Sequence, residues 1–415
     1  MKKTSIWALT LTLIATAPIA CTIKEASDED SGGSDAGGQA GDGGETAKGG
    51  STAKGGSTAK GGETAKGGET AKGGETAQGG TTATTGGATA QGGTTAGTTS
   101  TVVRTVIEID ADITAPTTWT ADHIYVLPSN ATIDVTSTLT IQAGTIVKVK
   151  SGGYLAVSST GTLLATGTAT DHITFTSIQD DVGGDTNGDG SATTTNPAPW
   201  RGLYVDGSGS SFTYIDYRYS TDGLELRGTN QSVTYSTFVA NDLALDASGV
   251  DDATKTTIQN NTFYSNKEPL VIRGGVAVDA TNVFHNPADA TKKNSFQSIR
   301  VTSDINDSVT WSNTEVAYAF AATNATFDVA ASQVLTLAAG VALKFGLGST
   351  LSVAAGASIA GRDGAIFTAY NDDTVLGDSD NTANSTSTAG YWTGLYDANA
   401  SGWQTATNIK FAESH

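Results

Sequence analysis

Short apolar pairs, each separated by one polar or apolar residue, recur along the chain at intervals of six to ten positions. They are Ile133/Val135, Leu139/Ile141, Val147/Val149, Leu155/Val157 and Ile173/Phe175, with the single Leu163 between the last two pairs. Alternation of this kind is the period of a strand with one buried face. Gly, Ser, Thr and Asn fill the intervals, and no segment shows sustained helical spacing. The pattern therefore predicts an all-β fold made of many short strands.

The strands also repeat as groups. Three strands occupy about 22 residues, and the segment 233–241 (VTYSTFVAN) returns 25 positions later as 258–266 (IQNNTFYSN). Strand triads with this spacing can wind as a parallel β-helix, whose coils pair at about 4.8 Å. Asn241 and Asn266 would then stack in a turn and bond along the axis. A β-sandwich is the alternative, but its Asn-Gly hairpin signals are rare here.

The β-rich region is itself duplicated. Trp119 recurs as Trp311 and Trp200 recurs as Trp392, each 192 positions later, while Lys148 corresponds to Lys344. These matches predict one β-helix module over residues 103–294 and a second, incomplete module over 295–415.

The second copy stops early. Residues 409–414 (IKFAES) resemble 215–220 (IDYRYS), after which the first copy continues for about 70 residues. We therefore expect His415 to end a strand and the last coil to leave an open backbone edge. Either the sequence is a fragment or something else covers that coil.

The strand pattern also resembles a known family. The segments Thr118-Trp119, 125–127 (YVL), 139–145 (LTIQAGT) and 173–177 (ITFTS) follow one another as in bacterial surface proteins of the right-handed parallel β-helix, pectate-lyase-like type. The resemblance covers residues 103–415 and implies a right-handed parallel β-helix. It leaves function open, because this superfamily includes pectin-degrading enzymes, phage tailspikes and adhesins.

The first 102 residues differ in character from the rest. Met1-Lys2-Lys3 is a positively charged start, and an apolar stretch follows over residues 6–20, which predicts a signal peptide over residues 1–20. Cys21 is the only cysteine and follows directly, where a bacterial lipoprotein receives its lipid. We therefore expect attachment to a membrane through lipidated Cys21, at the outer membrane or cell surface, with a secreted form as the alternative.

Residues 21–102 contain a hexapeptide repeat of the form Gly-Gly-Glu/Ser-Thr-Ala-Lys and no aromatic residue. Such a segment buries too little apolar area to offset chain entropy. We expect a disordered, Gly/Thr-rich linker that tethers the folded part.

The net negative charge of the chain bears on whether it binds nucleic acid. The chain has 42 acidic and 23 basic residues and a formal charge of −19. Nucleic-acid binding needs clustered Lys and Arg, so the composition argues against it.

An acidic loop in the first copy resembles part of a calcium loop. Asp185, Asn187 and Asp189 occupy its first, third and fifth positions, but the twelfth lacks the bidentate Glu. Asp180 and Asp181 would have to complete a weak site, with a dissociation constant on the order of 10⁻⁴–10⁻³ M. The second copy places Asp378 and Asp380 in a similar loop. Asp, Asn and Gly also occur in any protruding turn, which is the alternative.

Evidence for catalysis is weaker, and we assign no catalytic residue. A lyase would need a cation, for which Arg218, Arg227 and Arg273 are available, but no histidine has a metal-ligand companion nearby. Two aromatic pairs, Trp200/Tyr204 and Trp392/Tyr396, could stack on sugars, although their repetition also fits core packing.

The sequence thus favours a non-catalytic surface β-helix for adhesion, glycan or surface binding, or structural display, with calcium in its loops. A polysaccharide-active enzyme, a lyase or glycoside hydrolase, is the alternative.

Overall fold

The protein is described by a computed structural model, which covers residues 104–190 and 199–415. The predicted signal peptide, Cys21 and the linker lie outside these residues. The described chain forms 32 strands and two short 3₁₀ helices, η1 (Ala253–Lys255) and η2 (Arg362–Gly364). Within the described ranges, no helix is long and apolar enough to cross a membrane.

Three long parallel sheets hold the first copy. Sheet A has seven strands, in the order β1 (Thr105–Glu108), β3 (His123–Leu127), β6 (Ile146–Val149), β9 (Ile173–Ser177), β12 (Ile215–Arg218), β15 (Thr237–Val239) and β18 (Thr262–Tyr264). Sheet C has six: β2 (Thr117–Trp119), β5 (Thr138–Gln142), β8 (Thr162–Thr166), β11 (Ser211–Thr213), β14 (Ser232–Thr234) and β17 (Thr257–Gln259).

Sheet B has ten strands and runs through both copies. They are β4 (Thr132–Val135), β7 (Tyr154–Val157), β10 (Trp200–Val205), β13 (Ser220–Leu226), β16 (Leu243–Ala247), β19 (Glu268–Ile272), β22 (Ser298–Val301), β24 (Ala317–Phe320), β27 (Ala342–Phe345) and β30 (Ile366–Ala369).

The second copy adds two smaller sheets. Sheet D comprises β23 (Val309–Trp311), β26 (Val334–Leu337) and β29 (Ser358–Ala360), and sheet E comprises β25 (Thr326–Val329), β28 (Thr350–Val353), β31 (Gly394–Asp397) and β32 (Gly402–Gln404). A separate hairpin joins β20 (His285–Asn286) to β21 (Asp289–Lys293).

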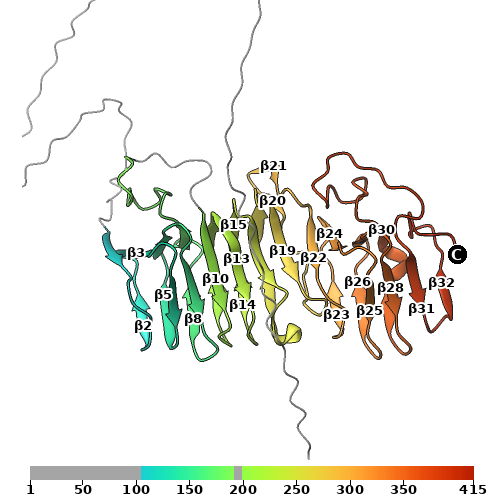
Figure 1. Cartoon of the computed structure of the whole chain (residues 1–415), viewed down its shortest axis with the longest axis horizontal. Helices are drawn as coiled ribbons and strands as arrows, with labels where there is room; N and C mark the ends of the chain where they lie inside the picture. Colours follow the sequence, from blue (N-terminus) through green and yellow to red (C-terminus); the bar gives the residue numbers. More distant parts are fainter. Residues whose placement is uncertain (1–103, 191–198) are drawn as a thin grey trace, which may run out of the picture. The chain divides into compact units, whose positions relative to one another are not determined.

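Each coil of the first copy visits sheets C, A and B in turn, and each strand pairs in parallel with its counterpart in the next coil (Figure 1). Among the named strands, only β20–β21 and β31–β32 pair antiparallel. The predicted parallel β-helix is therefore confirmed, and the β-sandwich alternative is wrong.

Alternation along each strand builds one continuous core. In β5, Leu139 and Ile141 are fully buried, whereas the flanking Thr138 and Thr140 are partly exposed. Aromatic rings stack above one another on the inner side of sheet A. Neighbouring ring centroids of Phe238, Phe263 and Phe284 lie 5.0 and 5.3 Å apart.

Buried asparagines form a second stack. The side-chain amide of Asn241 donates to Oδ1 of Asn266 at 2.9 Å, and that of Asn266 donates to Oδ1 of Asn294 at 2.9 Å. The predicted bond between Asn241 and Asn266 is confirmed. A parallel ladder that the sequence analysis missed links Asn261 to Asn282 at 3.1 Å.

Left-handed residues set the short period of these coils. Tyr219, Ala240 and Ser265 all have φ between 57° and 62° and recur at the corner between sheets A and B. Non-glycine residues rarely adopt this conformation. A single left-handed residue turns the chain sharply, and the residue that follows it in successive coils is Ser220, Asn241 and Asn266, which are linked by hydrogen bonds.

The second copy is rotated by one sheet relative to the first. By sequence, β22 corresponds to β1 and β24 corresponds to β3. In the first copy this pair belongs to sheet A, but β22 and β24 pair within sheet B. Because β22 also pairs with β19, the two copies share one core rather than two.

Equivalent tryptophans nevertheless have like surroundings. The ring of Trp119 stacks on Tyr125 with centroids 4.6 Å apart, and Trp311 stacks on Tyr318 at 4.5 Å. The duplication inferred from sequence is therefore a duplication of structure.

The end of the described chain differs from expectation. Ile409 bridges Phe367 as Tyr217 pairs with Phe175, so Ile409 takes the place of Tyr217 and the predicted match to Ile215 is two residues off. Instead of leaving an open edge on the last strand of sheet E, the chain folds back as β32 and pairs with β31. His415 ends no strand: its ring stacks on Trp403 at 3.9 Å.

A change in residue pattern explains this departure. Gln404 occupies the position of Phe212, which is fully buried in the first copy. Burying an amide there without partners would be costly. The chain instead turns back, which lets Trp403 contact Tyr396 and His415.

Candidate functional site

One lysine per copy lies buried on the outer side of its sheet. Lys148 stands in β6 between the core residues Val147 and Val149, so it points away from the core, yet it is fully buried. The loop that follows β9 covers it, and Nζ donates to the Gly184 carbonyl at 2.7 Å and to Thr186 Oγ1 at 3.0 Å. Lys148 thus fastens the first acidic loop to sheet A.

Lys344 does the same in the second copy. It is fully buried in β27, and its Nζ donates to the Gly377 carbonyl at 2.6 Å. Burial lowers the pKa of Lys344 to about 8, although the carboxylates of Asp372, Asp373 and others oppose the shift. Burial also lowers the pKa of Lys148. The sequence match between these lysines was visible, but the cover that buries them was not.

A threonine and an aspartate anchor each loop where it leaves the sheet. Thr176 donates to Asp180 Oδ2 at 2.7 Å, and Thr368 donates to Asp372 Oδ2 at 2.6 Å. Both aspartates are buried. Asp180 was predicted to help complete the metal site of the first loop. Its carboxylate faces the sheet instead and does not belong to the carboxylate group formed by Asp181, Asp185 and Asp189.

The first acidic loop gathers three of its predicted ligands. One carboxylate oxygen from each of Asp181, Asp185 and Asp189 lies within 4.8 Å of the others. Asp185 Oδ1 accepts from the backbone of Gly188 at 2.7 Å, and such N–H donors hold the pKa of Asp185 below its usual range. Asn187 points its amide nitrogen at Asp189, with a distance of 2.7 Å.

The second loop forms a matching group. Asp378 and Asp380 lie with Asp373, whose role the sequence analysis did not assign, and their carboxylate oxygens are within 4.8 Å of one another. Burial raises the pKa of Asp380, and the adjacent carboxylates raise it further. Oδ1 of Asp373 is buried and has no hydrogen-bond partner among the described residues. The carboxylates of this group thus repel one another.

Arg218, one of the cations considered for catalysis, is held by two carboxylates. Its guanidinium lies 2.9 Å from Asp216 Oδ2 and 3.6 Å from Asp180 Oδ2. His172 Nδ1 lies 2.9 Å from the other oxygen of Asp216. The neighbouring Asp181 belongs to the group with Asp185 and Asp189 instead. The carboxylates of Asp180 and Asp181 therefore point to different partners. Arg273 donates to the Val250 carbonyl at 2.8 Å.

A groove of about 370 Å³ crosses the outer face of sheet B in the first copy. Its lining includes Tyr154, Tyr204, Arg201, Arg227 and Asp206. The guanidinium carbon of Arg201 lies 4.7 Å from the centre of the Tyr154 ring, and that of Arg227 lies 5.4 Å from the centre of the Tyr204 ring.

Ion pairs hold the groove side chains in place. Arg201 bonds to Asp222 at 3.0 Å, and Tyr204 donates to the same carboxylate. Arg227 bonds to Glu225 at 2.7 Å. The side chains are therefore fixed before any ligand arrives.

The predicted stacking role does not suit the tryptophans. Trp200 and Trp392 are fully buried, and each indole nitrogen donates to a backbone carbonyl of the next coil, at 2.8 Å to Arg218 and 2.7 Å to Lys410. The pairing of β10 with β13 is irregular between Trp200 and Gly202, and the alternation of buried and exposed side chains along β10 is broken after Gly202. Tyr204 and Tyr396 are half-buried, and Tyr396 contacts Trp403.

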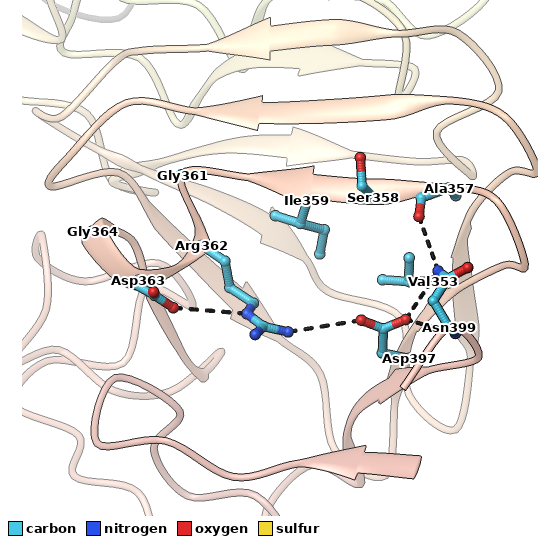
Figure 2. Close-up of a pocket in the computed structure, with 10 residues that line it drawn as sticks. All are labelled: Val353, Ala357, Ser358, Ile359, Gly361, Arg362, Asp363, Gly364, Asp397 and Asn399. Atoms are coloured by element: carbon cyan, nitrogen blue, oxygen red, sulfur yellow. Dashed lines mark hydrogen bonds and ion pairs between the residues drawn. The ribbon is translucent and has the colours of Figure 1, made fainter. Parts of the chain in front are cut away.

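A second cavity, of about 410 Å³, lies beside β29 in the second copy. Figure 2 shows Arg362 reaching toward Asp397, with Asn399 beside it. Arg362 Nη1 and Asp397 Oδ2 are 3.8 Å apart, and Asn399 donates to the Ala357 carbonyl at 3.0 Å. These polar groups are directed at one another rather than at an open reaction site.

Comparisons with known proteins agree with the fold. Residues 111–196 match the family model described as pectate-lyase like beta helix domain. The match covers the first coils and the first acidic loop. No curated protein and no solved structure matches the chain. The matched part of the chain is thus similar to a pectate-lyase-like β-helix domain, in line with the resemblance seen in the sequence, and the described residues form a parallel β-helix.

Proposed function

We propose that the protein is a non-catalytic β-helix, displayed at the cell surface, that binds a glycan chain along the outer face of sheet B. The groove around Tyr154 and Tyr204 is the observation on which the proposal rests. Surface display depends on the signal peptide, the lipidation of Cys21 and the linker, which stay predictions.

The groove has the size and chemistry of a sugar site. A volume of about 370 Å³ falls in the range of small-ligand pockets. Charged side chains held in ion pairs offer fixed donors and acceptors to sugar hydroxyls, and tyrosine rings offer apolar edges. Because Arg201 and Arg227 already cover tyrosine faces, sugars would contact these side chains mainly through hydrogen bonds.

The same ion pairs argue against catalysis in the groove. A hydrogen bond to Asp222 raises the pKa of Arg201, and one to Glu225 raises that of Arg227. An arginine that is held protonated is a poor proton acceptor. The alternative, a polysaccharide-active enzyme, is favoured only by the fold it shares with such enzymes.

Affinity electrophoresis through gels that contain polygalacturonate or a neutral glucan tests the binding. We expect retardation of the protein by at least one polymer, and Tyr154→Ala should weaken binding about tenfold. Tyr396→Ala is the control, since Tyr396 is the second-copy counterpart of Tyr204 and does not line the groove. Equal retardation of both variants, or release of new reducing or unsaturated ends from either polymer, would contradict the proposal.

We further propose that the two acidic loops bind calcium. Carboxylate oxygens are the ligands that calcium prefers, and each loop brings three of them together. With a dissociation constant on the order of 10⁻⁴–10⁻³ M, calcium at ten times that concentration would stabilise the fold by about 1.4 kcal/mol per site.

Differential scanning calorimetry with and without calcium tests this proposal. The melting temperature should rise with calcium, and the rise should be roughly halved by Asp189→Asn and abolished when Asp378→Asn is added. Asp363→Asn, an exposed acid outside both loops, is the control. An unchanged melting temperature at saturating calcium would contradict the calcium proposal. It would not affect the proposal that the groove on sheet B binds a glycan.

A further inference from the structure

The Asn-Gly dipeptide in the first acidic loop is the remaining sequence signal that neither proposal uses. Asn187 and Gly188 are both exposed. A β-carbon placed on Gly188 would meet no atom within 4 Å, so nothing crowds its backbone nitrogen. A backbone nitrogen next to a side-chain amide is the arrangement from which asparagine can cyclise.

We propose that Asn187 is a self-catalysed deamidation site, at which the backbone nitrogen of Gly188 attacks the side-chain amide of Asn187. The Gly188 N–Cγ bond forms and the Cγ–Nδ2 bond breaks. The proton lost from Gly188 N is transferred to Nδ2, and Nδ2 leaves as ammonia. Water then opens the cyclic imide, which yields aspartate or isoaspartate.

Asp185 is placed to act as the base in the first step. Its Oδ1 accepts the Gly188 N–H at 2.7 Å, so the proton that must leave already points at a carboxylate. Oδ2 of the same carboxylate accepts a second backbone N–H, from Gly190 at 2.9 Å, which holds the Asp185 side chain in this position. A base within hydrogen-bond reach of the proton that it removes is the geometric requirement for general-base catalysis.

The side-chain amide of Asn187 is also held in place by hydrogen bonds. Asn187 Nδ2 donates to Asp189 Oδ2 at 2.7 Å, which fixes the orientation of the amide plane. Asn187 Oδ1 then faces the backbone N–H of Asp189 at 3.3 Å. Negative charge develops on this oxygen during the attack, and a backbone N–H aimed at it stabilises that charge. The loop thus supplies both a base and an oxyanion donor.

Peptide mapping by mass spectrometry of the full chain, incubated at 37 °C and neutral pH, tests the proposal. We expect Asn187 to convert to Asp and isoAsp faster in the folded chain than in a synthetic peptide of residues 183–190. Asp185→Ala should slow the reaction by up to about 100-fold. The rate of the synthetic peptide is the lower limit of this effect. Isoaspartate is detected by its methylation with an isoaspartyl methyltransferase.

Two controls make the result decisive. Gly188→Ala should slow the reaction by adding a side chain at the nucleophile. Asn384, an exposed asparagine followed by Ser385 in the second loop, should stay amidated over the same period. A folded chain that deamidates no faster than the peptide would overturn the proposal, as would an Asp185→Ala variant that reacts at the native rate.

Discussion

Replacing Asn266 with leucine is expected to lower the free energy of unfolding by about 4 kcal/mol. The substitution keeps the volume but removes the centre of the asparagine ladder. Asn266 Oδ1 accepts from the backbone N–H of Asn241 at 3.0 Å, and Nδ2 donates to the Phe238 carbonyl at 3.0 Å. Both partners would stay buried without a bond, at a cost of about 1–3 kcal/mol for each orphaned group.

Urea denaturation of the single and double variants measures this loss. Asn241→Leu/Asn266→Leu should cost less than the sum of the single changes, because the two residues share hydrogen bonds. Asn399→Leu, which removes an exposed asparagine, serves as the control and should cost much less. A loss below about 1 kcal/mol for Asn266→Leu would show that the ladder contributes no more than an ordinary surface bond.

The second large effect concerns pH. Raising the pH from 8 to 9.5 is expected to stabilise the native protein by about 2 kcal/mol through Lys344 alone. The pKa of Lys344 is lowered to about 8 from 10.5, so the folded state binds fewer protons in this window than the unfolded state does. Stability therefore rises with pH, and the whole difference amounts to about 3 kcal/mol.

Lys344→Met isolates the effect, because methionine fills the space and does not titrate. The pH dependence of the unfolding free energy, measured without added divalent cations, should flatten in the variant by about 2 kcal/mol across that window. Lys255→Met, at an exposed lysine, should leave it unchanged. The window stops at 9.5 because burial raises the pKa of Tyr217 and Tyr318, which reverses the trend once unfolded tyrosines ionise. Parallel curves for the native chain and Lys344→Met would contradict the prediction.

The fold could be predicted because its determinants repeat along the sequence. Alternation within each strand fixes which side chains face inward, and the spacing of Asn241 and Asn266 shows which side chains stack. Asn294 was missed because the hairpin β20–β21 lengthens its coil, so its distance from Asn266 is 28 residues.

The candidate sites could be predicted only in part, because their geometry depends on contacts distant in sequence. Lys148 is buried by a loop that begins some thirty residues later, and the sequence around Lys148 does not indicate that this loop covers it. Trp200 and Tyr204 lie four positions apart on one strand, but Trp200 is buried in the core and Tyr204 is not, because the alternation along the strand is broken between them. The composition of the acidic loops indicated carboxylate clusters, yet not that Asp180 would turn to Thr176 while Asp181 joined the cluster.

Sheet B continues unbroken from the first copy into the second, but its outer surface does not stay accessible. The outward row is open at Asp134, Tyr204 and Asp246. It is covered at Val271, Ala319, Lys344 and Thr368, while Arg300, which lies between Val271 and Ala319, stays partly exposed. The accessible track thus extends over five strands, or about 20 Å. Under the glycan-binding proposal, a polymer that follows this track loses contact with the row at Val271 in β19, so the protein would bind only a short stretch of it, however long the polymer is.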